Sequence, residues 1–461
     1  MVKLSTTEIA YSGDRFGTYP LTWGQQWLWR AVSTQAPHYA HLGIPIRLKV
    51  PTGCDVEGVL TMLSTVIERH EVLRTRYFVD AQGAANQVIS AGGKLSVQLY
   101  DVEDSSPSGV ADHLESEMTS TPFTMPEISI RAAIVTAAEV PLFVILAIFH
   151  MAIDGWSTPL ITGEIKQLLE AAARHAAQPD LGDIVHPVDR LRAEQGPEGV
   201  ARSQLALEFW KKELREFPRL TGESVPKVSV ARRFEEHIMR SRLTALAVTL
   251  LSARFKSSPA AVLLTYVHKV LREEYGMTRC GFMVFSHNRF GPTDFTYSGP
   301  LTQSVPVALN HTASDMHEQV RMTHQAMLES SISGECDPEA ARALINSFRK
   351  YGESGPNVSY AFNAHFDGIK YGVLPSERKA PSEIEHVVKD STDTSFPEAR
   401  SYVYDDMKFF MEAQDEEDGY YIQLRADTAL FPSAHIVAFL KELEFSLAES
   451  AGLLNPDGVI H

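Results

Sequence analysis

A histidine, an aspartate and a glycine lie close together near residue 150, in the stretch HMAIDGWS. A histidine in such a position can accept a proton from an attacking amine or alcohol, or hold that group by a hydrogen bond, and His150 is the candidate here. Asp154 could brace the turn through an ion pair, and backbone N–H groups near Gly155, at the start of a helix, could stabilise an oxyanion. A simpler interpretation is that His150 ends a strand and Asp154 caps the following helix. The residues of this stretch alone leave both interpretations open.

The segments on either side of this stretch are expected to fix its position. Residues 142–149 are apolar without alternation, which predicts a strand buried on both faces. Residues 159–173 have the pattern of a helix, so residues 150–156 form a short turn between the two elements. A strand, a tight turn and a helix in this order hold polar side chains at the edge of a sheet.

Strands and helices recur along the rest of the chain, which predicts an α/β or α+β fold with two lobes of similar size. Further helices are predicted at residues 20–31, 56–69, 203–216, 259–274 and 433–448. Further strands are predicted at residues 73–79, 128–135, 281–286, 303–309, 357–362 and 420–425. Residues 176–200 contain proline, glycine and charges without a sustained period, as in a linker. The expected division is therefore an N-terminal lobe at 1–175, a linker at 176–200 and a C-terminal lobe at 201–461.

The composition is that of an ordinary globular chain of 461 residues, with 44% hydrophobic and 22% charged residues. The 58 acidic residues outnumber the 42 Lys and Arg, giving a net charge of −16, which disfavours a nucleic-acid or anionic-membrane partner. The three cysteines are widely spaced, so no disulfide framework or metal site is predicted. No apolar run approaches the roughly 20 residues of a membrane helix, and the expected location is the cytoplasm.

Several stretches together resemble the condensation domains of non-ribosomal peptide synthetases. The match follows the family's order along almost the whole chain. The matching stretches are PLTWGQQWLW (20–29), RHEVLRT (69–75), HMAIDGWS (150–157), LEFWKKEL (207–214), VFSHNR (284–289), GPLTQSVPV (299–307) and ADTALF (426–431). This ordered set is far more specific than any single stretch.

The resemblance implies two chloramphenicol-acetyltransferase-like lobes, arranged as a V-shaped pseudo-dimer with the active site in a tunnel between them. His150 matches the functionally central histidine of the family's HHxxxDGxS motif, and the backbone N–H of Gly155 is expected near the donor thioester. Asp154 matches the structural aspartate, and Arg289 is the best-placed partner for it, bridging the lobes. The substrates implied are thioesters on the 4'-phosphopantetheine arms of carrier proteins, with no tightly bound cofactor and no metal. An amine or hydroxyl, including that of a small molecule, attacks the donor and gives an amide or ester.

Two positions depart from the family pattern. Phe149 replaces the first motif histidine, and Gln303 replaces an asparagine in the later strand, where a longer amide could remodel the tunnel. These two residues are candidates to line the substrate tunnel, and so are three others from the matched stretches, Trp156, Ser157 and Ser286. The chain shows neither an adenylate-forming motif nor a carrier-type serine motif, so we expect a free-standing condensation enzyme of natural-product (antibiotic) biosynthesis.

Two alternatives stay open on the sequence. One is an acyltransferase of the same superfamily that uses an acyl-coenzyme A donor, since DFTYSG (294–299) partly resembles the DFGWG motif of such enzymes. The other is a catalytically silent docking module, which the loss of the first histidine at Phe149 would permit. His150, Asp154 and Gly155 favour an enzyme, and RHEVLRT favours the condensation type.

Overall fold

The chain divides into two compact units. The computed structural model describes residues 2–35, 42–103, 106–124, 127–219, 233–310, 315–348, 355–366, 394–397, 399–402, 407–416 and 419–454. Unit 1 comprises Met1–Arg202 and His287–Gln303, and unit 2 comprises Ser203–Ser286 and Ser304–His461. We call His287–Gln303 the crossover segment, because it returns from the second half of the sequence to unit 1.

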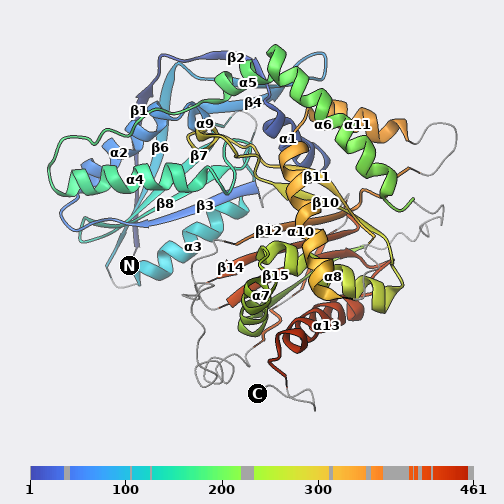
Figure 1. Ribbon diagram of the computed structural model, residues 1–461. Coiled ribbons are helices and arrows are strands. Elements are labelled where there is room, and N and C mark those ends of the chain that lie inside the picture. The colour runs from blue at the N-terminus through green and yellow to red at the C-terminus, as the bar shows by residue number, and fades with distance from the viewer. Residues whose placement is uncertain are drawn as a thin grey trace. The chain divides into compact units, whose positions relative to one another are not determined.

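Unit 1 is built on a mixed five-stranded sheet (Figure 1). Its strand order is β1 (Val2–Ser12), β6 (Gly92–Val102), β7 (Ile130–Ala137), β8 (Val140–Phe149) and β3 (Gly43–Lys49). A smaller sheet joins β2 (Gly17–Pro20), β5 (Ala85–Ile89) and β4 (Thr75–Val79). The helices are α1 (Trp23–Gln35), α2 (Val56–Arg69), α3 (Pro107–Ser120), α4 (Thr158–Ala173), α5 (Pro187–Gln195) and, in the crossover segment, the short α9 (Pro292–Phe295).

The central strand β8 is buried on both faces, as its unbroken apolar sequence predicted. Val144, Leu146 and Ile148 pack into one hydrophobic cluster with side chains of α2 and α4. The alternate residues, Ile145 and Phe149 among them, pack into a second cluster with side chains of α1 and α3. Successive side chains of a strand point to opposite faces, so helices on both sides require the apolar run. Because helices pack on both faces of the sheet, the end of β8 is held in place, and the candidate turn begins at this point.

Unit 2 is built on a seven-stranded mixed sheet. Its order is β11 (Gln303–Leu309), β10 (Cys280–Ser286), β12 (Tyr360–His365), β14 (Phe409–Glu416), β15 (Gly419–Asp427), β9 (Phe234–Ser241) and β13 (Arg400–Tyr402). The remaining helices are α6 (Pro197–Glu216), which contains the boundary between the units, α7 (Arg242–Phe255), α8 (Pro259–Tyr275), α10 (Met316–Ser333), α11 (Pro338–Ser347) and α13 (Ser433–Ala451).

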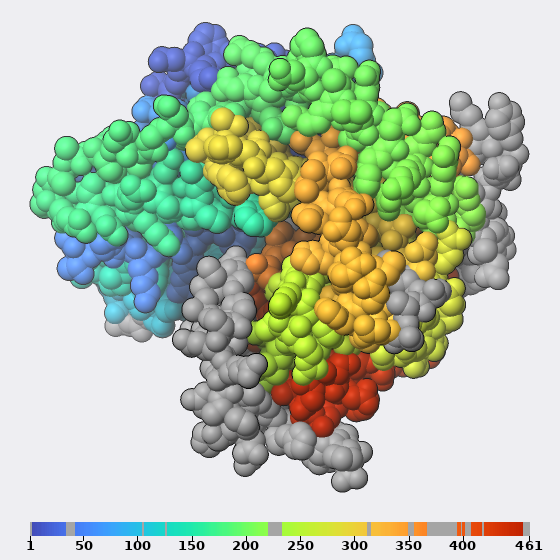
Figure 2. Space-filling model, viewed as in Figure 1, coloured from blue at the N-terminus to red at the C-terminus, as the bar shows by residue number. Residues whose placement is uncertain are grey.

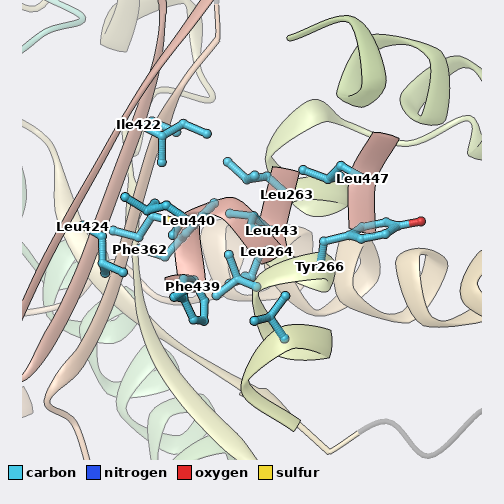
Figure 3. Packing of buried hydrophobic residues seen from close by; sticks show 14 of the residues in the cluster. Leu263, Leu264, Tyr266, Phe362, Ile422, Leu424, Phe439, Leu440, Leu443 and Leu447 are labelled. Carbon is cyan, nitrogen blue, oxygen red and sulfur yellow. The ribbon is translucent and has the colours of Figure 1, made fainter. Parts of the chain in front are cut away.

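The core of unit 2 lies between one face of this sheet and helices α7, α8, α10 and α13. Figure 3 shows Leu263 and Leu264 of α8, Leu443 of α13, and Phe362 and Ile422 of the sheet pointing into the same apolar layer. A separate cluster packs α6 and α11 around Trp210 and Phe217, next to Met283 and Ala361 on the opposite face of the sheet. No helix in the described parts of the chain has both the length and the apolar character needed to span a bilayer.

Some sequence predictions of local structure are corrected. Residues 73 and 74, predicted as the start of a strand at 73–79, belong instead to a short 3-10 helix (Glu71–Arg74), and the strand β4 begins only at Thr75. Residues 357–359 lie outside β12, which extends instead to His365. The segment 176–200, predicted as a linker, contains α5 and the start of α6. The extent of the domains within the chain stays a prediction.

Candidate active site

His150 follows directly after β8 and is half-buried. Its backbone N–H donates to the carbonyl oxygen of Leu42 at 2.7 Å, which fixes the main chain at this point. Its ring Nδ1 lies 2.7 Å from the carbonyl oxygen of Ile153, three residues later. A carbonyl oxygen only accepts, so this geometry assigns the proton to Nδ1 and leaves the lone pair on Nε2. The neutral ring is therefore held in the tautomer that can accept a proton through Nε2.

Asp154 closes the turn with its own neighbours. Its carboxylate Oδ1 accepts from the backbone N–H of Ser157 at 2.9 Å and of Trp156 at 3.2 Å. The Ser157 hydroxyl in turn accepts from the Asp154 N–H at 2.9 Å and lies 3.0 Å from Oδ1. These reciprocal bonds form a compact polar turn immediately before α4 and explain why an aspartate and a serine are spaced by three.

The same carboxylate also anchors the crossover segment. Arg289 grips it with two guanidinium nitrogens, Nη1 to Oδ2 and Nη2 to Oδ1, both at 2.9 Å. The backbone N–H of Leu301 donates to Oδ2 at 2.9 Å, and Thr302 adds its N–H at 3.2 Å and its hydroxyl at 3.0 Å. The Arg289 and Asp154 side chains are each 1% exposed, so this is a buried, fork-shaped ion pair within unit 1.

The charge state of Asp154 follows from these contacts. Burial by itself raises the pKa of this carboxyl, but the guanidinium of Arg289 and the hydrogen bonds from Leu301 and Ser157 outweigh it and lower the pKa to about 2. Asp154 is thus a permanent anion under physiological conditions and does not exchange protons with a substrate. The structural role that the resemblance implies for Asp154 stays a prediction.

Gly155 and Trp156 form the exposed part of the turn. In the described residues, the N–H of Gly155 has no hydrogen-bond partner, so it is free to approach a ligand. The indole of Trp156 is 45% exposed, and its ring lies 4.4 Å from that of His287 in the crossover segment. Phe290, itself 52% exposed, continues this row of rings at 5.3 Å from His287. Figure 2 shows the exposed surface of the crossover segment, in yellow, beside the green and blue-green atoms of residues 150–200.

The other tunnel candidates lie in different surroundings. Phe149 is 4% exposed, and its ring stacks on Phe123 at 5.2 Å and meets Tyr77 edge-on at 5.9 Å, so it packs in the core of unit 1. Ser286 ends β10, and its buried hydroxyl has no partner within the described part of the chain. Gln303 begins β11 and is 3% exposed. Whether these residues line a substrate tunnel stays a prediction.

Two residues of the Asp154 cluster had no signal of their own in the sequence. Leu301 and Thr302 stand in the stretch GPLTQ that matched the family, but nothing in the sequence connected that stretch with a carboxylate about 150 residues earlier. The backbone N–H of Leu301 in particular carries no side-chain information. No group of three His, Cys, Asp or Glu side chains within the described ranges is placed to hold a metal ion.

Sequence comparisons identify the family directly. The model of the condensation domain family matches residues 16–339. A linear gramicidin synthase protein of Brevibacillus parabrevis is 29% identical over 208 residues, which are 44% of this chain and 4% of that protein. The chain thus matches only a small part of the length of this much larger relative.

Solved structures show the same fold over nearly the whole chain. The SgcC5 protein of Streptomyces globisporus matches with a TM-score of 0.68 at 18% identity, covering 94% of this chain and 99% of that one. A mutant starter condensation domain of rhizomide synthetase, solved in complex with C8-CoA, matches with a TM-score of 0.65 at 15% identity, covering 94% and 95%. Because the family model matches most of the chain, the chain belongs to the condensation domain family, the acyltransferase-type enzymes of non-ribosomal peptide synthesis.

Proposed function

We propose that the protein joins an acyl group, carried as a thioester on the 4'-phosphopantetheine arm of a carrier protein, to an amine or hydroxyl nucleophile. The nucleophile's nitrogen or oxygen forms the new bond to the acyl carbon, and the carbon–sulfur bond breaks. The proton leaves the nucleophile and ends on the released thiolate. The product is an amide or an ester in the synthesis of a natural product.

The observation that carries this proposal is the fixed tautomer of His150. The contact of Nδ1 with the Ile153 carbonyl oxygen leaves Nε2 ready to take the nucleophile's proton, and the same nitrogen can pass it to the leaving sulfur. The next polar residue, Asp154, is fully engaged with Arg289 and the crossover segment, so it shapes the turn and does not compete for that proton. The N–H of Gly155 supplies a donor for the oxyanion of the tetrahedral intermediate.

The family supplies the rest of the proposal. On this view the two compact units are the two chloramphenicol-acetyltransferase-like lobes of a V-shaped pseudo-dimer, and the active site lies between them. Carrier proteins deliver the donor and, in some reactions, the acceptor, in the cytoplasm. No tightly bound cofactor is required, because the phosphopantetheine belongs to the carrier.

The test compares donors under matched conditions. Purified protein receives the same acyl group either on a holo-carrier protein or on coenzyme A, together with a set of amines and alcohols, and the product is measured by mass spectrometry. Faster turnover from the carrier supports the proposal. No product from any carrier-bound donor, in the presence of a partner complex that forms normally, would instead indicate a docking module.

A second candidate function has one observation in its favour. The rhizomide starter condensation domain that shares this fold was solved with C8-CoA. An acyl-coenzyme A donor is therefore the alternative to be measured in the same assay. Comparable turnover from coenzyme A and from the carrier would support it.

A further inference from the structure

A second polar cluster in unit 1 links α4 to the crossover segment through a buried histidine. His70, the residue after α2, has Nε2 2.8 Å from Oε2 of Glu164 and Nδ1 2.8 Å from the hydroxyl of Ser298. Arg69 grips the same Glu164 carboxylate through Nε at 2.9 Å and Nη2 at 3.2 Å. His70 and Ser298 are fully buried and Glu164 is 4% exposed. We call Ser298, His70 and Glu164 the histidine bridge.

The partners of His70 assign its protons. An ionised carboxylate such as that of Glu164 only accepts, so Nε2 carries the hydrogen and donates to it. Nδ1 then holds the lone pair and accepts from the hydroxyl of Ser298. Burial lowers the pKa of His70, more than the hydrogen bond and charge of Glu164 raise it, which agrees with a neutral ring. All three polar groups are satisfied in this arrangement.

A serine that donates to a histidine backed by a carboxylate also occurs in hydrolases that use a serine nucleophile. That role is incompatible with the burial of this cluster. The Ser298 side chain has no exposed surface, and neither has His70. A substrate carbonyl has no route to the hydroxyl, so the bridge acts on the protein itself.

Both ends of the bridge belong to elements that hold the Asp154 turn. Glu164 lies in the second turn of α4, the helix that starts immediately after Ser157. Ser298 lies in the crossover segment, between Arg289 and Leu301, which both bind Asp154. The contacts therefore form a closed ring, from the Asp154 turn along α4 to Glu164, across His70 to Ser298, and back through the crossover segment to Asp154.

We infer that Ser298, His70 and Glu164 are positioning residues, which hold the crossover segment at a fixed distance from α4 so that Leu301 and Thr302 stay on Asp154. The bridge acts on the catalytic turn only through that segment and touches no reacting atom. Its consequence for turnover rests on the proposed function, whereas its consequence for the crossover segment does not.

Other contacts keep the segment in place when the bridge is cut. The N–H of Ser298 donates to the carbonyl oxygen of Val185 at 2.9 Å, and the N–H of Val185 donates to that of Thr296 at 3.1 Å. Tyr297 is 1% exposed and anchors the segment in unit 1. Removing only the Ser298 hydroxyl should therefore loosen the segment locally without unfolding the unit.

Amide hydrogen exchange tests the inference without any turnover. In Ser298→Ala, and more strongly in His70→Leu, exchange at the amides of Leu301 and Thr302 should accelerate about five- to tenfold, the worth of one lost hydrogen bond. His70→Gln keeps one acceptor and one donor on the side chain and should restore most of the protection. The matched control is Ile165→Val, which weakens the α4 core one residue from Glu164 without touching the bridge.

The outcomes of this experiment distinguish a positioning role of the histidine bridge from a general contribution to stability. A selective loss of protection at 301–302 in the bridge variants, absent in Ile165→Val, supports the inference. Unchanged exchange at 301–302 in both Ser298→Ala and His70→Leu would overturn it. The inference would also be overturned if Ile165→Val lowered the unfolding midpoint as much as the bridge variants do and accelerated exchange at the amides of Leu301 and Thr302 to the same degree.

A double-mutant cycle adds the catalytic consequence. Ser298→Ala should lower kcat about 10- to 100-fold with little change in KM, the scale of a small misplacement of catalytic groups. In a Thr302→Val background, where the hydroxyl contact with Asp154 is already lost, the further loss should be less than about threefold, because both changes act on the same segment. Fully multiplicative effects would contradict a path through the crossover segment. If the parent protein shows no turnover at all, the proposed function fails, but the exchange result still decides the role of the bridge.

Discussion

Asp154→Asn removes one charge from the centre of the turn and leaves its shape almost unchanged. The guanidinium of Arg289, with its side chain 1% exposed, then stays buried without an anion. The carboxamide also presents an NH2 group to a site lined by donors, including the N–H of Leu301 and the hydroxyl of Thr302. In either orientation of the new amide, its NH2 group faces a hydrogen-bond donor of the crossover segment or of the turn.

The expected loss of stability can be worked from these contacts. A drop in the pKa of Asp154 from 3.8 to about 2 corresponds to about 2–3 kcal/mol in favour of the charged carboxylate. The opposed donors add to that figure, and removal of one partner of a buried pair typically costs about 3–5 kcal/mol. We therefore expect Asp154→Asn to lower the free energy of unfolding by about 3–5 kcal/mol at pH 7.

Urea unfolding followed by tryptophan fluorescence measures this change in unit 1, where Asp154 lies. Four of the five tryptophans lie in unit 1: Trp23, Trp27, Trp29 and Trp156. The control is the double variant Asp154→Asn/Arg289→Met, which removes both charges and should recover at least about 1 kcal/mol of the loss, because no unpaired buried charge is left.

The pH dependence gives a second check on the same variant. The pKa of Asp154 is lower in the folded chain, so the carboxylate contributes its stability above pH 3.8 and loses it as the pH falls towards 2. The difference in the free energy of unfolding between the parent and Asp154→Asn should therefore become smaller as the pH falls through that range. The reasoning is refuted if the variant unfolds at the same urea concentration as the parent at pH 7, or if the double variant is less stable than the single one.

Three further predictions concern the surroundings of the site. Burial, and then repulsion from Arg15, lower the pKa of His186 to about 4. As the pH falls from 6.5 to 4, the free energy of unfolding of the parent should therefore drop by up to about 3 kcal/mol more than that of His186→Asn. Parallel pH profiles of urea unfolding for the two proteins would contradict this. Phe149→His places a polar ring against Phe123 and should cost about 1–3 kcal/mol with no gain in turnover, and a faster enzyme would show that the first motif histidine is catalytic after all. Gly24→Ala would put a Cβ 2.0 Å from the carbonyl oxygen of Pro300, so it should displace the crossover segment and cost at least about 1–3 kcal/mol; a thermal midpoint equal to that of the parent would show that this contact is not tight.

Elements with a strong local pattern were predicted well from the sequence. The helix α2 begins at Val56 and ends at Arg69, as expected from its apolar period, because one face of the helix is buried and the other is not. The helix α8 begins at Pro259, as predicted, because Ser258 caps its first turn and a proline is favourable at the first helical position. The strand β11 covers residues 303–309, as predicted.

Elements that depend on distant partners were missed. The strand β1 is exposed along most of its length and is held by its pairing with β6, about 90 residues away in the sequence. No local sequence pattern indicates this pairing. The helix α3 (Pro107–Ser120) was not predicted, and it begins within a stretch rich in proline and serine, residues that are also common in loops. The same residues cap the helix, since Ser106 accepts from the N–H of Gly109. Local composition could not distinguish a cap from a turn.

The candidate site shows the same division. His150, Asp154 and Gly155 could be selected as candidates because they lie close together in the sequence, and the contact of Arg289 with Asp154 was predicted only through the resemblance to a family. The histidine bridge was not predicted, although its member His70 stands in the matched stretch RHEVLRT, because its other members, Glu164 and Ser298, are ordinary residues in a helix and a loop. Their proximity comes from the packing of α2, α4 and the crossover segment.

The most direct test of the proposed mechanism is the turnover of His150→Ala with a carrier-bound donor. Loss of the proton acceptor should lower kcat by about 10²–10⁴-fold, the usual contribution of a positioned acid–base group. The midpoint of unfolding should change little, because the ring is half-buried and, among the described residues, makes one hydrogen bond, to Ile153. A His150→Ala protein that keeps the parent's kcat with its fold intact would contradict a catalytic role for His150 and with it the proposed mechanism.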